Sequence, residues 1–421
     1  MGKHIIEEAK RCLLCKKPLC REGCPVGTSI PEMISLFLNG DIKGSGEMLF
    51  NNNPLSIVCS LICPHENFCE GHCVLGKKGA PVQISSIENY ISTYYLDKVQ
   101  MNPDKKKGAK VAIIGSGPAG ITVAFILSLK GFDITVFESE DKIGGVLRYG
   151  IPDYRLPKDT IDKMSSMLVK MGVKIRPNTL IGPVLTLDDL FRDGYKSIFI
   201  GTGVWSPKPL RIEGESLGHV HFAINYLKNP DVYNLGKKVC IIGAGNVAMD
   251  VARTALRKNS SDVTIVYRRG EEDISATKYE IDYAKIDGVA FEFYKSPLRI
   301  TDQGVIFVQT KKITKDNGEV VITVIPDTEE LFAADSVIIA ASQNARSNIV
   351  SNTEGISTSK YGLLITDECG RTTRDGVFAS GDVVTGAKTV VEAVHYSKKT
   401  ACAIEDYIKE KYGIGENCCD C

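Results

Sequence analysis

The sequence lacks an excess of either charge, an export signal and a long uninterrupted apolar run. Lysine plus arginine and aspartate plus glutamate both total 51, so the formal net charge is zero. Without a basic field, the chain is not expected to bind nucleic acid or an anionic membrane surface. The first ten residues contain no apolar core or cleavage site, and the apolar run 111–129 is interrupted by "GSGPAG". We therefore expect a cytoplasmic protein that does not span a membrane.

Cysteine, by contrast, is abundant and unevenly distributed. Fourteen cysteines occur in 421 residues, a length sufficient for about three domains. Eight lie between Cys12 and Cys73, and three more are Cys418, Cys419 and Cys421. A reducing cytoplasm disfavours disulfides, so the dense group at the front predicts metal binding. For the last three cysteines we expect frayed exposed thiols, with a partner-facing thiol or a further metal ligand as the alternative.

The front cysteines form two closely spaced runs. The first has the spacing C-x2-C-x4-C-x3-C-P, and the second also contains a cysteine that precedes a proline. Thiolates at such spacing can each ligate one iron of a 4Fe-4S cluster, and in two-cluster ferredoxins the cysteine before proline ligates the other cluster. We therefore expect two clusters with interleaved ligands; structural zinc is the alternative, although zinc favours paired C-x2-C knuckles. The runs are Cys12, Cys15, Cys20 and Cys24, then Cys59, Cys63, Cys69 and Cys73.

After a charged segment at 102–108, the pattern changes to alternating strands and helices. The stretches "KVAIIGSGPAG" and "KVCIIGAGNVAMD" each predict a strand, a glycine turn and the start of a helix, with a second strand in "FDITVFE" and "DVTIVYRR". The residues before 102 predict short helices, among them 31–39 and 85–98, and no strands. The predicted class is α/β, with two Rossmann-like dinucleotide-binding domains, one inserted in the other, preceded by a small α-helical domain.

The first glycine turn has the G-x-G-x-x-G pattern of a dinucleotide site. Gly115 permits the tight turn, Gly117 lets the backbone approach a pyrophosphate, and Gly120 lets the helix pack on the strand. The helix N-terminus then directs about half a positive charge toward the phosphates. Glu138 closes the next strand and is placed to accept hydrogen bonds from ribose hydroxyls.

Two further stretches favour FAD at this first turn. The segment "GGVLRYGIP" at 144–152 follows the acid directly, and Asp382 in "GVFASGD" suits a ribityl or phosphate-linked hydroxyl. An ordinary turn at a strand end is the alternative for Asp382. The candidate residues are Gly115, Gly117, Pro118, Ala119, Gly120, Glu138, Gly145, Leu147, Gly381 and Asp382.

The second glycine turn favours NADPH. Ala248 replaces the third glycine, and the next strand ends in Arg268 and Arg269 where an acid would suit NADH. Guanidinium groups bind a 2′-phosphate, each charge-assisted hydrogen bond contributing about 1.5 to 3 kcal/mol, so two contacts predict a preference of roughly a hundredfold or more. NADH and arginines that only cap a solvated strand end are the alternatives. The candidate residues are Gly243, Gly245, Asn246, Val247, Arg268 and Arg269.

These motifs predict four segments along the chain. Residues 1–107 form the helical domain with two 4Fe-4S clusters, and 108–205 form the first part of the FAD domain. Residues 206–330 form the inserted NAD(P)H domain, and 331–421 form the second part of the FAD domain with the cysteine-rich tail. Cys240 lies inside a strand with no C-x-x-C partner, so we expect it in the core and expect no disulfide relay.

In this order and spacing, the motifs resemble the small subunit of glutamate synthase and the related electron-input half of dihydropyrimidine dehydrogenase. The resemblance covers nearly all of the chain and is carried by "RCLLCKKPLCREGCPVG", "CPHENFCEGHCVLG", "GAPVQISSIE", "GGVLRYGIPDYRLPK", "GAGNVAMDVARTA", "YRRGEED" and "GVFASGDVVTGAKTVVEA". It implies that Cys12, Cys15, Cys20 and Cys73 hold one cluster and that Cys24, Cys63, Cys69 and Glu88 hold the other. Cys59 is then surplus, and a surface position is the alternative for Glu88.

The resemblance also implies where the flavin ring and the electron acceptor lie. It places the segment 386–393 against the ring, which adds Thr389 and Val390 to the candidate FAD residues. Arg155, in the matching stretch "GGVLRYGIPDYRLPK", completes them. His395 is expected to be a packing residue. No amidotransferase or pyrimidine-reducing domain is present, so the acceptor is expected on another chain. That partner is a large subunit like that of glutamate synthase or dihydropyrimidine dehydrogenase, or ferredoxin. A non-enzymatic zinc-binding flavoprotein scaffold is a further alternative.

No side chain is expected to act as a catalytic acid or base. Hydride passes between two cofactor rings, and positioning supplies the main catalytic contribution. The expected activity is hydride transfer from NADPH to FAD, followed by single-electron transfer through the clusters to the partner.

Overall fold

The chain forms two compact units. The structure, a computed structural model, describes residues 2–99, 101, 103–315 and 320–414. The first unit comprises 1–147, 153–204 and 344–421, and the second comprises 148–152 and 205–343. Within the described residues, no helix is both long and apolar enough to cross a membrane.

The first unit begins with a region of short helices, residues 2–99, which we call the helical region. Its described residues contain no strand, and the two helices predicted there correspond to α3 and α6. Ile87 and Ile91 of α6 are four residues apart on one face of the helix, and with Met33 of α3 they are fully buried in a common core. The helices are α1 (Gly2–Lys10), α2 (Leu19–Glu22), α3 (Ile30–Leu38), α4 (Ile42–Asn52), α5 (Ser56–Ile62), the 3-10 helix η1 (Val74–Lys77) and α6 (Ile84–Lys98).

A five-stranded parallel sheet follows in the same unit, with the strand order β16-β4-β1-β2-β3. Every residue of β1 after Lys110 is buried, as expected for a parallel strand that is covered on both faces. The strands are β1 (Lys110–Ile114), β2 (Asp133–Phe137), β3 (Lys174–Arg176), β4 (Tyr195–Ile200) and β16 (Val377–Ala379).

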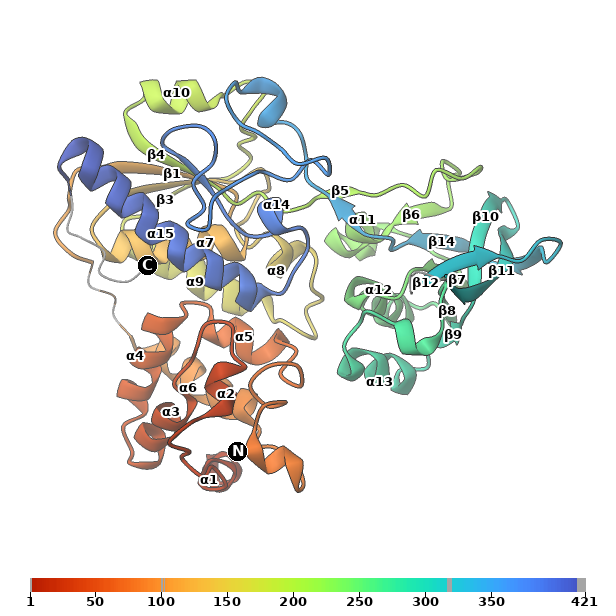
Figure 1. Cartoon of the computed structure of the whole chain (residues 1–421), viewed down its shortest axis with the longest axis horizontal. Helices are drawn as coiled ribbons and strands as arrows, with labels where there is room; N and C mark the ends of the chain where they lie inside the picture. Colours follow the sequence, from red (N-terminus) through yellow and green to blue (C-terminus); the bar gives the residue numbers. More distant parts are fainter. Residues whose placement is uncertain (1, 100, 102, 316–319, 415–421) are drawn as a thin grey trace. The chain divides into compact units, whose positions relative to one another are not determined.

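Helices cover this sheet and connect its strands. The helix α7 packs against β1, β2 and the long C-terminal helix α15, while α10 packs against β4 (Figure 1). The carboxyl ends of all five strands lie at one edge, where the first glycine turn begins the helix α7. The helices are α7 (Pro118–Leu129), α8 (Val146–Tyr149), α9 (Lys158–Lys170), α10 (Leu187–Arg192), the 3-10 helix η4 (Val350–Asn352), α14 (Asp382–Thr385) and α15 (Val390–Tyr412).

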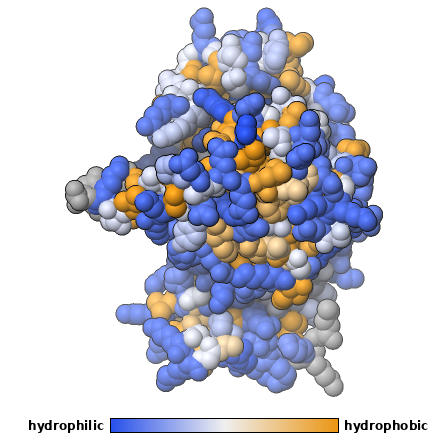
Figure 2. All heavy atoms as spheres, turned by 90° about the vertical axis from the view of Figure 1, so that its right-hand side faces the viewer, coloured by the Kyte–Doolittle hydropathy of each residue, from blue (hydrophilic) through white to orange (hydrophobic). Residues whose placement is uncertain are grey.

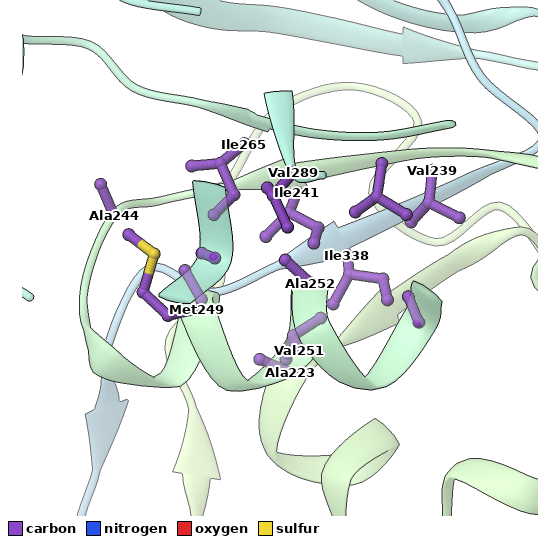
Figure 3. Close-up of a cluster of buried hydrophobic side chains, with 14 of the residues drawn as sticks. Ala223, Val239, Ile241, Ala244, Met249, Val251, Ala252, Ile265, Val289 and Ile338 are labelled. Carbon is purple, nitrogen blue, oxygen red and sulfur yellow. The ribbon is translucent and has the colours of Figure 1, made fainter. Parts of the chain in front are cut away.

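The second unit contains another five-stranded parallel sheet, with the order β6-β14-β7-β8-β9. Figure 3 shows its core, in which Met249 of α12 lies beside Ile241 and Ile265 of the sheet, all three fully buried. The elements are β6 (Val220–Phe222), α11 (Ala223–Lys228), the 3-10 helix η2 (Pro230–Val232), β7 (Lys238–Ile242), α12 (Asn246–Arg257), β8 (Asp262–Val266), the 3-10 helix η3 (Glu271–Asp273), α13 (Lys278–Ile286), β9 (Ala290–Glu292) and β14 (Ser336–Ile339).

A smaller antiparallel sheet completes the second unit. Its central strand β11 pairs with β10, β12 and β13. Leu298, Val320 and Leu331 of this sheet are exposed, and Figure 2 shows one face of the molecule on which apolar side chains lie among a hydrophilic majority. The strands are β10 (Lys295–Thr301), β11 (Gly304–Thr314), β12 (Val320–Val324) and β13 (Glu330–Ala333).

Two short paired strands, β5 (Ser206–Pro207) and β15 (Gln343–Asn344), carry the chain out of and back into the first unit. Our sequence analysis placed the return at 331, whereas the first unit resumes at Asn344. The reason is β14, which pairs with β6 and β7 and so belongs to the second sheet. An isolated apolar strand does not reveal from sequence which of two parallel sheets it will join. The predicted α/β class with two Rossmann-like units and a helical N-terminal region is confirmed.

Candidate functional site

The turn after β1 presses two of its glycines against neighbouring backbone. Gly115 has a φ of +92°, and a Cβ atom added there would lie 2.6 Å from the carbonyl oxygen of Gly201. A Cβ atom at Gly120 would lie 2.0 Å from the carbonyl oxygen of Gly115. The fold itself therefore excludes side chains at both positions. Gly117 differs, because a Cβ atom added there would meet no described atom within 4 Å, so the space beside it is free for a ligand.

Glu138 holds this turn in place from the end of β2. Its side chain is buried, and its Oε2 accepts hydrogen bonds from the Ser116 hydroxyl and, at 2.9 Å, from the Ser116 backbone N–H. Its Oε1 accepts the backbone N–H of Glu140 at 2.9 Å. Our sequence analysis missed Ser116, although its position inside the turn was a usable signal. The predicted hydrogen bond from a ribose hydroxyl to Glu138 stays a prediction.

Asp382 lies at the same edge of the sheet, directly after β16. Gly381 before it has a φ of +76°, which turns the chain into α14. Burial raises the pKa of Asp382 to about 6, although the backbone N–H of Lys388 donates to its Oδ1 at 3.2 Å. A buried carboxylate with one donor can accept another, as a ribityl hydroxyl would supply. Gly145 also lies here, because a Cβ atom added to it would be 2.7 Å from the Cα of Gly117.

The remaining candidate FAD residues differ in their surroundings. Pro118 and Ala119 begin α7, Leu147 is fully buried, and Arg155 is half-buried. Thr389 caps α15: its hydroxyl donates to Glu392 Oε2 at 2.6 Å and accepts the backbone N–H of Glu392. Val390 is the first residue of that helix. Thr389 and Val390 therefore form the helix N-terminus that the resemblance places near the flavin.

The second glycine turn follows β7 and resembles the first, except that Ala248 stands at the position of the third glycine. Gly243 has a φ of +125°, and a Cβ atom added there would lie 2.5 Å from the carbonyl oxygen of Ala340. For Gly245 the nearest atom to an added Cβ is the hydroxyl oxygen of Ser275, at 3.5 Å. Open space at the second glycine is what a bound pyrophosphate requires. Val247 follows in the first turn of α12.

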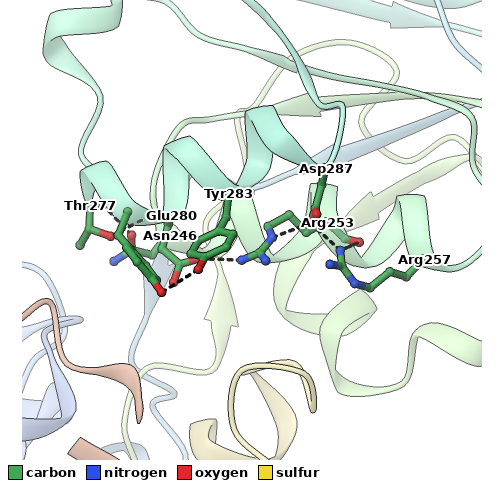
Figure 4. Close-up of polar contacts among 8 residues, drawn as sticks. Asn246, Arg253, Arg257, Thr277, Glu280, Tyr283 and Asp287 are labelled. Atoms are coloured by element: carbon green, nitrogen blue, oxygen red, sulfur yellow. Dashed lines mark hydrogen bonds and ion pairs between the residues drawn. The ribbon is translucent and has the colours of Figure 1, made fainter. Parts of the chain in front are cut away.

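Polar contacts fix the helix that begins at this turn (Figure 4). The side chain of Asn246 accepts the backbone N–H of Thr277 at 3.0 Å. Further along α12, the buried guanidinium of Arg253 binds Glu280 at 3.0 Å and Asp287 at 2.8 Å. These contacts tie α12 to α13, so the N-terminus of α12 is held rigidly at the edge of the second sheet.

The two arginines after β8 carry positive charge that the described residues leave uncompensated. Arg268 is exposed and Arg269 is half-buried, and the buried Nε of Arg269 has no hydrogen-bond partner. The nearby acids are engaged elsewhere, since Glu271 binds Lys285 and Asp273 binds Lys312. An orphaned guanidinium N–H at the end of this strand fits an anionic ligand such as a 2′-phosphate.

Cysteines of the helical region fall into two groups. The first lines a hollow together with apolar side chains of α3 and α6. Burial and the neighbouring thiols raise the pKa of Cys20 to about 11, and burial raises that of Cys12. Such thiols become thiolates only when a cation compensates them, as iron would. The members of this group are Cys12, Cys15, Cys20 and Cys73.

The second group combines thiols with a carboxylate. Cys69 faces Cys24 and Glu88, and Cys63 faces Cys69 and Glu88, with the pKa of both thiols raised. Burial raises the pKa of Glu88 to about 8, and no described donor hydrogen-bonds its carboxylate. Three thiols and an unbonded buried carboxylate fit a positively charged group between them.

Cys59 is the cysteine of the second run that the sequence analysis assigned to neither cluster. The structure buries it close to Cys63, whose backbone N–H donates to the carbonyl oxygen of Cys59 at 2.9 Å, and the side-chain amide of Asn53 donates to the Sγ of Cys59 at 3.3 Å. Its position four residues before Cys63 on the helix α5 was the available signal.

The described residues hold no group of three His, Cys, Asp or Glu side chains placed to bind one metal ion. Cys418, Cys419 and Cys421 lie outside the described residues, whereas Cys240 is fully buried in the core of the second unit.

These features define a class of protein: a pyridine nucleotide oxidoreductase of the two-domain flavoprotein fold with an iron-sulfur domain. The family "Pyridine nucleotide-disulphide oxidoreductase" matches residues 109–398, and "Dihydropyrimidine dehydrogenase domain II, 4Fe-4S cluster" matches residues 1–100. The chain belongs to the family of glutamate synthase small chains and the related PreT subunits of dihydropyrimidine dehydrogenase. The predicted flavin, nucleotide and 4Fe-4S classes of cofactor are confirmed at this family level.

Two relatives illustrate the family. The chain is 32% identical to the glutamate synthase [NADPH] small chain of Escherichia coli, over 96% of its length and 91% of that protein. It is also 32% identical to the NAD-dependent dihydropyrimidine dehydrogenase subunit PreT of the same organism, over 99% of its length and 95% of that protein.

Solved structures share the fold at low identity. Mycobacterium tuberculosis FprA in complex with NADPH has a TM-score of 0.59 at 17% identity, covering 75% of this chain and 87% of FprA. Lactococcus lactis thioredoxin reductase has a TM-score of 0.55 at 22% identity, covering 72% of this chain and 99% of the reductase. In the second unit of this chain Cys240 is the only cysteine, so the likeness to thioredoxin reductase does not extend to a disulfide there.

The two glycines of the first turn are expected to respond differently to alanine. Gly117→Ala should leave the fold intact and lower bound FAD several-fold, because the added methyl group occupies space that a pyrophosphate needs. Gly115→Ala, the comparison variant, should also lose about 1 to 3 kcal/mol of stability, because its positive φ and the Gly201 carbonyl both oppose a side chain. Flavin absorbance per chain and urea unfolding of the apoprotein measure the two effects. Unchanged flavin content in Gly117→Ala would contradict this placement of the pyrophosphate.

Proposed function

We propose that this chain is the electron-input subunit of a cytoplasmic enzyme that oxidises NADPH and passes the electrons to a partner subunit. When bound, FAD takes two electrons as a hydride and 4Fe-4S clusters take them one at a time, which explains why one chain combines both. The observation that carries the proposal is that a dinucleotide-type glycine turn and two groups of closely placed thiols occur in one compact unit. The chain's own residues bind and orient the cofactors.

The proposed cluster ligands follow the two groups of the helical region. Cys12, Cys15, Cys20 and Cys73 share the first hollow, which supports one cluster. The mutual placement of Cys24, Cys63, Cys69 and Glu88 supports the second, with an oxygen ligand in place of a fourth thiolate. Cys59, buried close to Cys63, supports this second group without ligating it.

The proposed nucleotide sites follow the two glycine turns. FAD binds at the first, where the buried Glu138 and the half-buried Asp382 follow β2 and β16 and offer carboxylate acceptors to its hydroxyls. NADPH binds at the second, where the exposed Arg268 and the unpaired Nε of Arg269 are available to the 2′-phosphate. The glutamate synthase relatives named for NADPH support this choice, and the PreT relatives named for NAD mark the alternative.

Arg268→Ala is expected to raise KM for NADPH by about ten- to a hundredfold, since one charge-assisted hydrogen bond of about 1.5 to 3 kcal/mol is lost. KM for NADH should change little, because NADH has no 2′-phosphate. Steady-state reduction of ferricyanide by either nucleotide measures both constants. Arg299→Ala, which removes an exposed arginine from β10 of the same unit, is the control for a general change of charge. An equal rise for both nucleotides would remove the argument for NADPH.

Anaerobically purified protein is expected to contain about eight irons and eight acid-labile sulfides per chain, as two 4Fe-4S clusters require. Cys69→Ala should lower the iron content by about half, because Cys69 belongs to one ligand group only. Cys369→Ala, which removes a half-buried thiol outside the helical region, should keep the full content. Iron and sulfide assays and the electron paramagnetic resonance spectrum measure the outcome. Zinc without sulfide would reject the proposal.

The proposed acceptor is a large catalytic subunit like that of glutamate synthase. The relatives named as a small chain and as a subunit support an acceptor on another chain. The alternative acceptor is a large subunit like that of dihydropyrimidine dehydrogenase, which the PreT relatives favour.

Anaerobic affinity purification is expected to recover such a large subunit together with this chain. Glutamate synthesis or pyrimidine reduction by the complex then tells the two acceptors apart. The isolated chain should reduce ferredoxin only slowly, because its clusters are expected to face the partner. Rapid ferredoxin reduction without another subunit would contradict the proposal and indicate a free-standing NAD(P)H–ferredoxin reductase.

A further inference from the structure

A chain of hydrogen-bonded side chains joins the long helix α15 to Cys24 in the helical region. The Nζ of Lys398 on α15 donates to the Oδ1 of Asn52 at 2.8 Å. The Nδ2 of Asn52 donates to the Oγ1 of Thr28 at 3.2 Å. The Oγ1 of Thr28 lies 3.5 Å from the Sγ of Cys24. The four residues come from α15, the end of α4 and the loop between α2 and α3, all within the first unit.

If Cys24 ligates iron, all the hydrogen bonds between Lys398 and Cys24 have their donors on the side of Lys398 and their acceptors on the side of the sulfur. A ligating cysteine is a thiolate and can only accept hydrogen bonds, so the Thr28 hydroxyl must donate to Cys24. The Thr28 oxygen is then free to accept from Asn52, whose own oxygen accepts from Lys398. Each donor therefore points toward the sulfur. Thr28 is buried, and aligned hydrogen bonds in a low-dielectric interior polarise and strengthen one another.

Lys398 places a positive charge at the outer end of this chain. Its side chain is half-buried, and among the described residues no carboxylate lies within ion-pair distance of it. Burial lowers the pKa of Lys398, and the sulfurs of Cys24 and Cys402 raise it. A buried ammonium without a carboxylate is costly unless some other negative group compensates it. A cluster bound through Cys24 would be such a group.

The helix α15 makes a second contact with the same loop. His395, about one turn before Lys398, lies close to the backbone of Pro25, the residue after Cys24. The helix also packs along α7, which begins at the first glycine turn. One rigid helix therefore links the elements proposed to bind FAD with the loop that carries Cys24.

We propose that Lys398, acting through Asn52 and Thr28, is a positioning residue that raises the reduction potential of the cluster held by Cys24. One-electron reduction adds one negative charge to a cluster, so a nearby cation and aligned donors stabilise the reduced form more than the oxidised form. The electron comes from reduced FAD, and no proton or bond moves in this step. This inference rests on the proposed function and its second ligand group.

The test is a redox titration of anaerobic holoprotein, followed by electron paramagnetic resonance of both clusters. Lys398→Met and Thr28→Val are each expected to lower the equilibrium constant for reducing one cluster about tenfold, which is about 59 mV for a one-electron couple. The affected signal should be the one that Cys69→Ala lacks. The other cluster should keep its potential.

Three matched variants separate tuning from a structural role. Lys398→Arg and Thr28→Ser keep the charge or the hydroxyl and should retain the wild-type potential. Lys399→Met removes the adjacent exposed lysine of α15 and should leave both potentials unchanged. Unshifted potentials in Lys398→Met and Thr28→Val at full iron content would overturn the inference. If Lys398→Met loses iron, the inference is judged by the reduction potential of the same cluster in Thr28→Val.

Failure of the underlying function has a different signature. Wild-type protein without iron or flavin would end both the proposed function and this inference. Wild-type protein with two clusters that NADPH reduces, but with variant potentials like its own, would end the inference alone.

Discussion

Buried negative charge is the constraint on which the rest of this structure depends. The helical region turns three thiols and the Glu88 carboxylate toward one another without hydrogen-bond donors for that carboxylate. As ligands these groups would all be anionic, and anions that close together in a low-dielectric interior require positive charge between or beside them. Iron would supply the first part of that charge. Lys398, reaching Cys24 through Asn52 and Thr28, would supply the second.

The two glycine turns show how one backbone device serves two nucleotides. Gly115 and Gly243 both have a positive φ and both lie against the backbone of a neighbouring strand end. The turns differ in the charge that follows the second strand. Glu138 is buried and bonds the first turn, whereas Arg268 and Arg269 leave positive charge at the second. The two sites therefore share the backbone conformation of the glycine turn. The residues that follow β2 and β8 differ in charge, and this difference separates the proposed FAD site from the proposed NADPH site.

The sequence predicted most where the physical signal is local. Short helices with apolar residues at helical spacing, and glycines between a strand and a helix, are recognisable because the residues that determine them are neighbours. The sequence-based prediction was weakest for features that depend on contacts between segments distant in the sequence. The sequence analysis placed the strand β14 in the FAD domain, whereas it joins the second sheet, because its four residues, Ser-Val-Ile-Ile, suit the interior of both sheets. Cys59 was set aside for the same reason, because only the fold turns α5 so that its sulfur meets Cys63.

By itself, the sequence determined the α/β class, the two dinucleotide turns and the presence of a cysteine-rich helical region, because spacing along the chain encodes each of them. The tertiary structure decided which side chains face one another: Cys24 with Cys69 and Glu88, Ser116 with Glu138, and Lys398 with Asn52. The members of each set are separated by between 19 and 346 positions. No local pattern specifies such contacts, since they arise only when packing of the helices and strands brings the segments together.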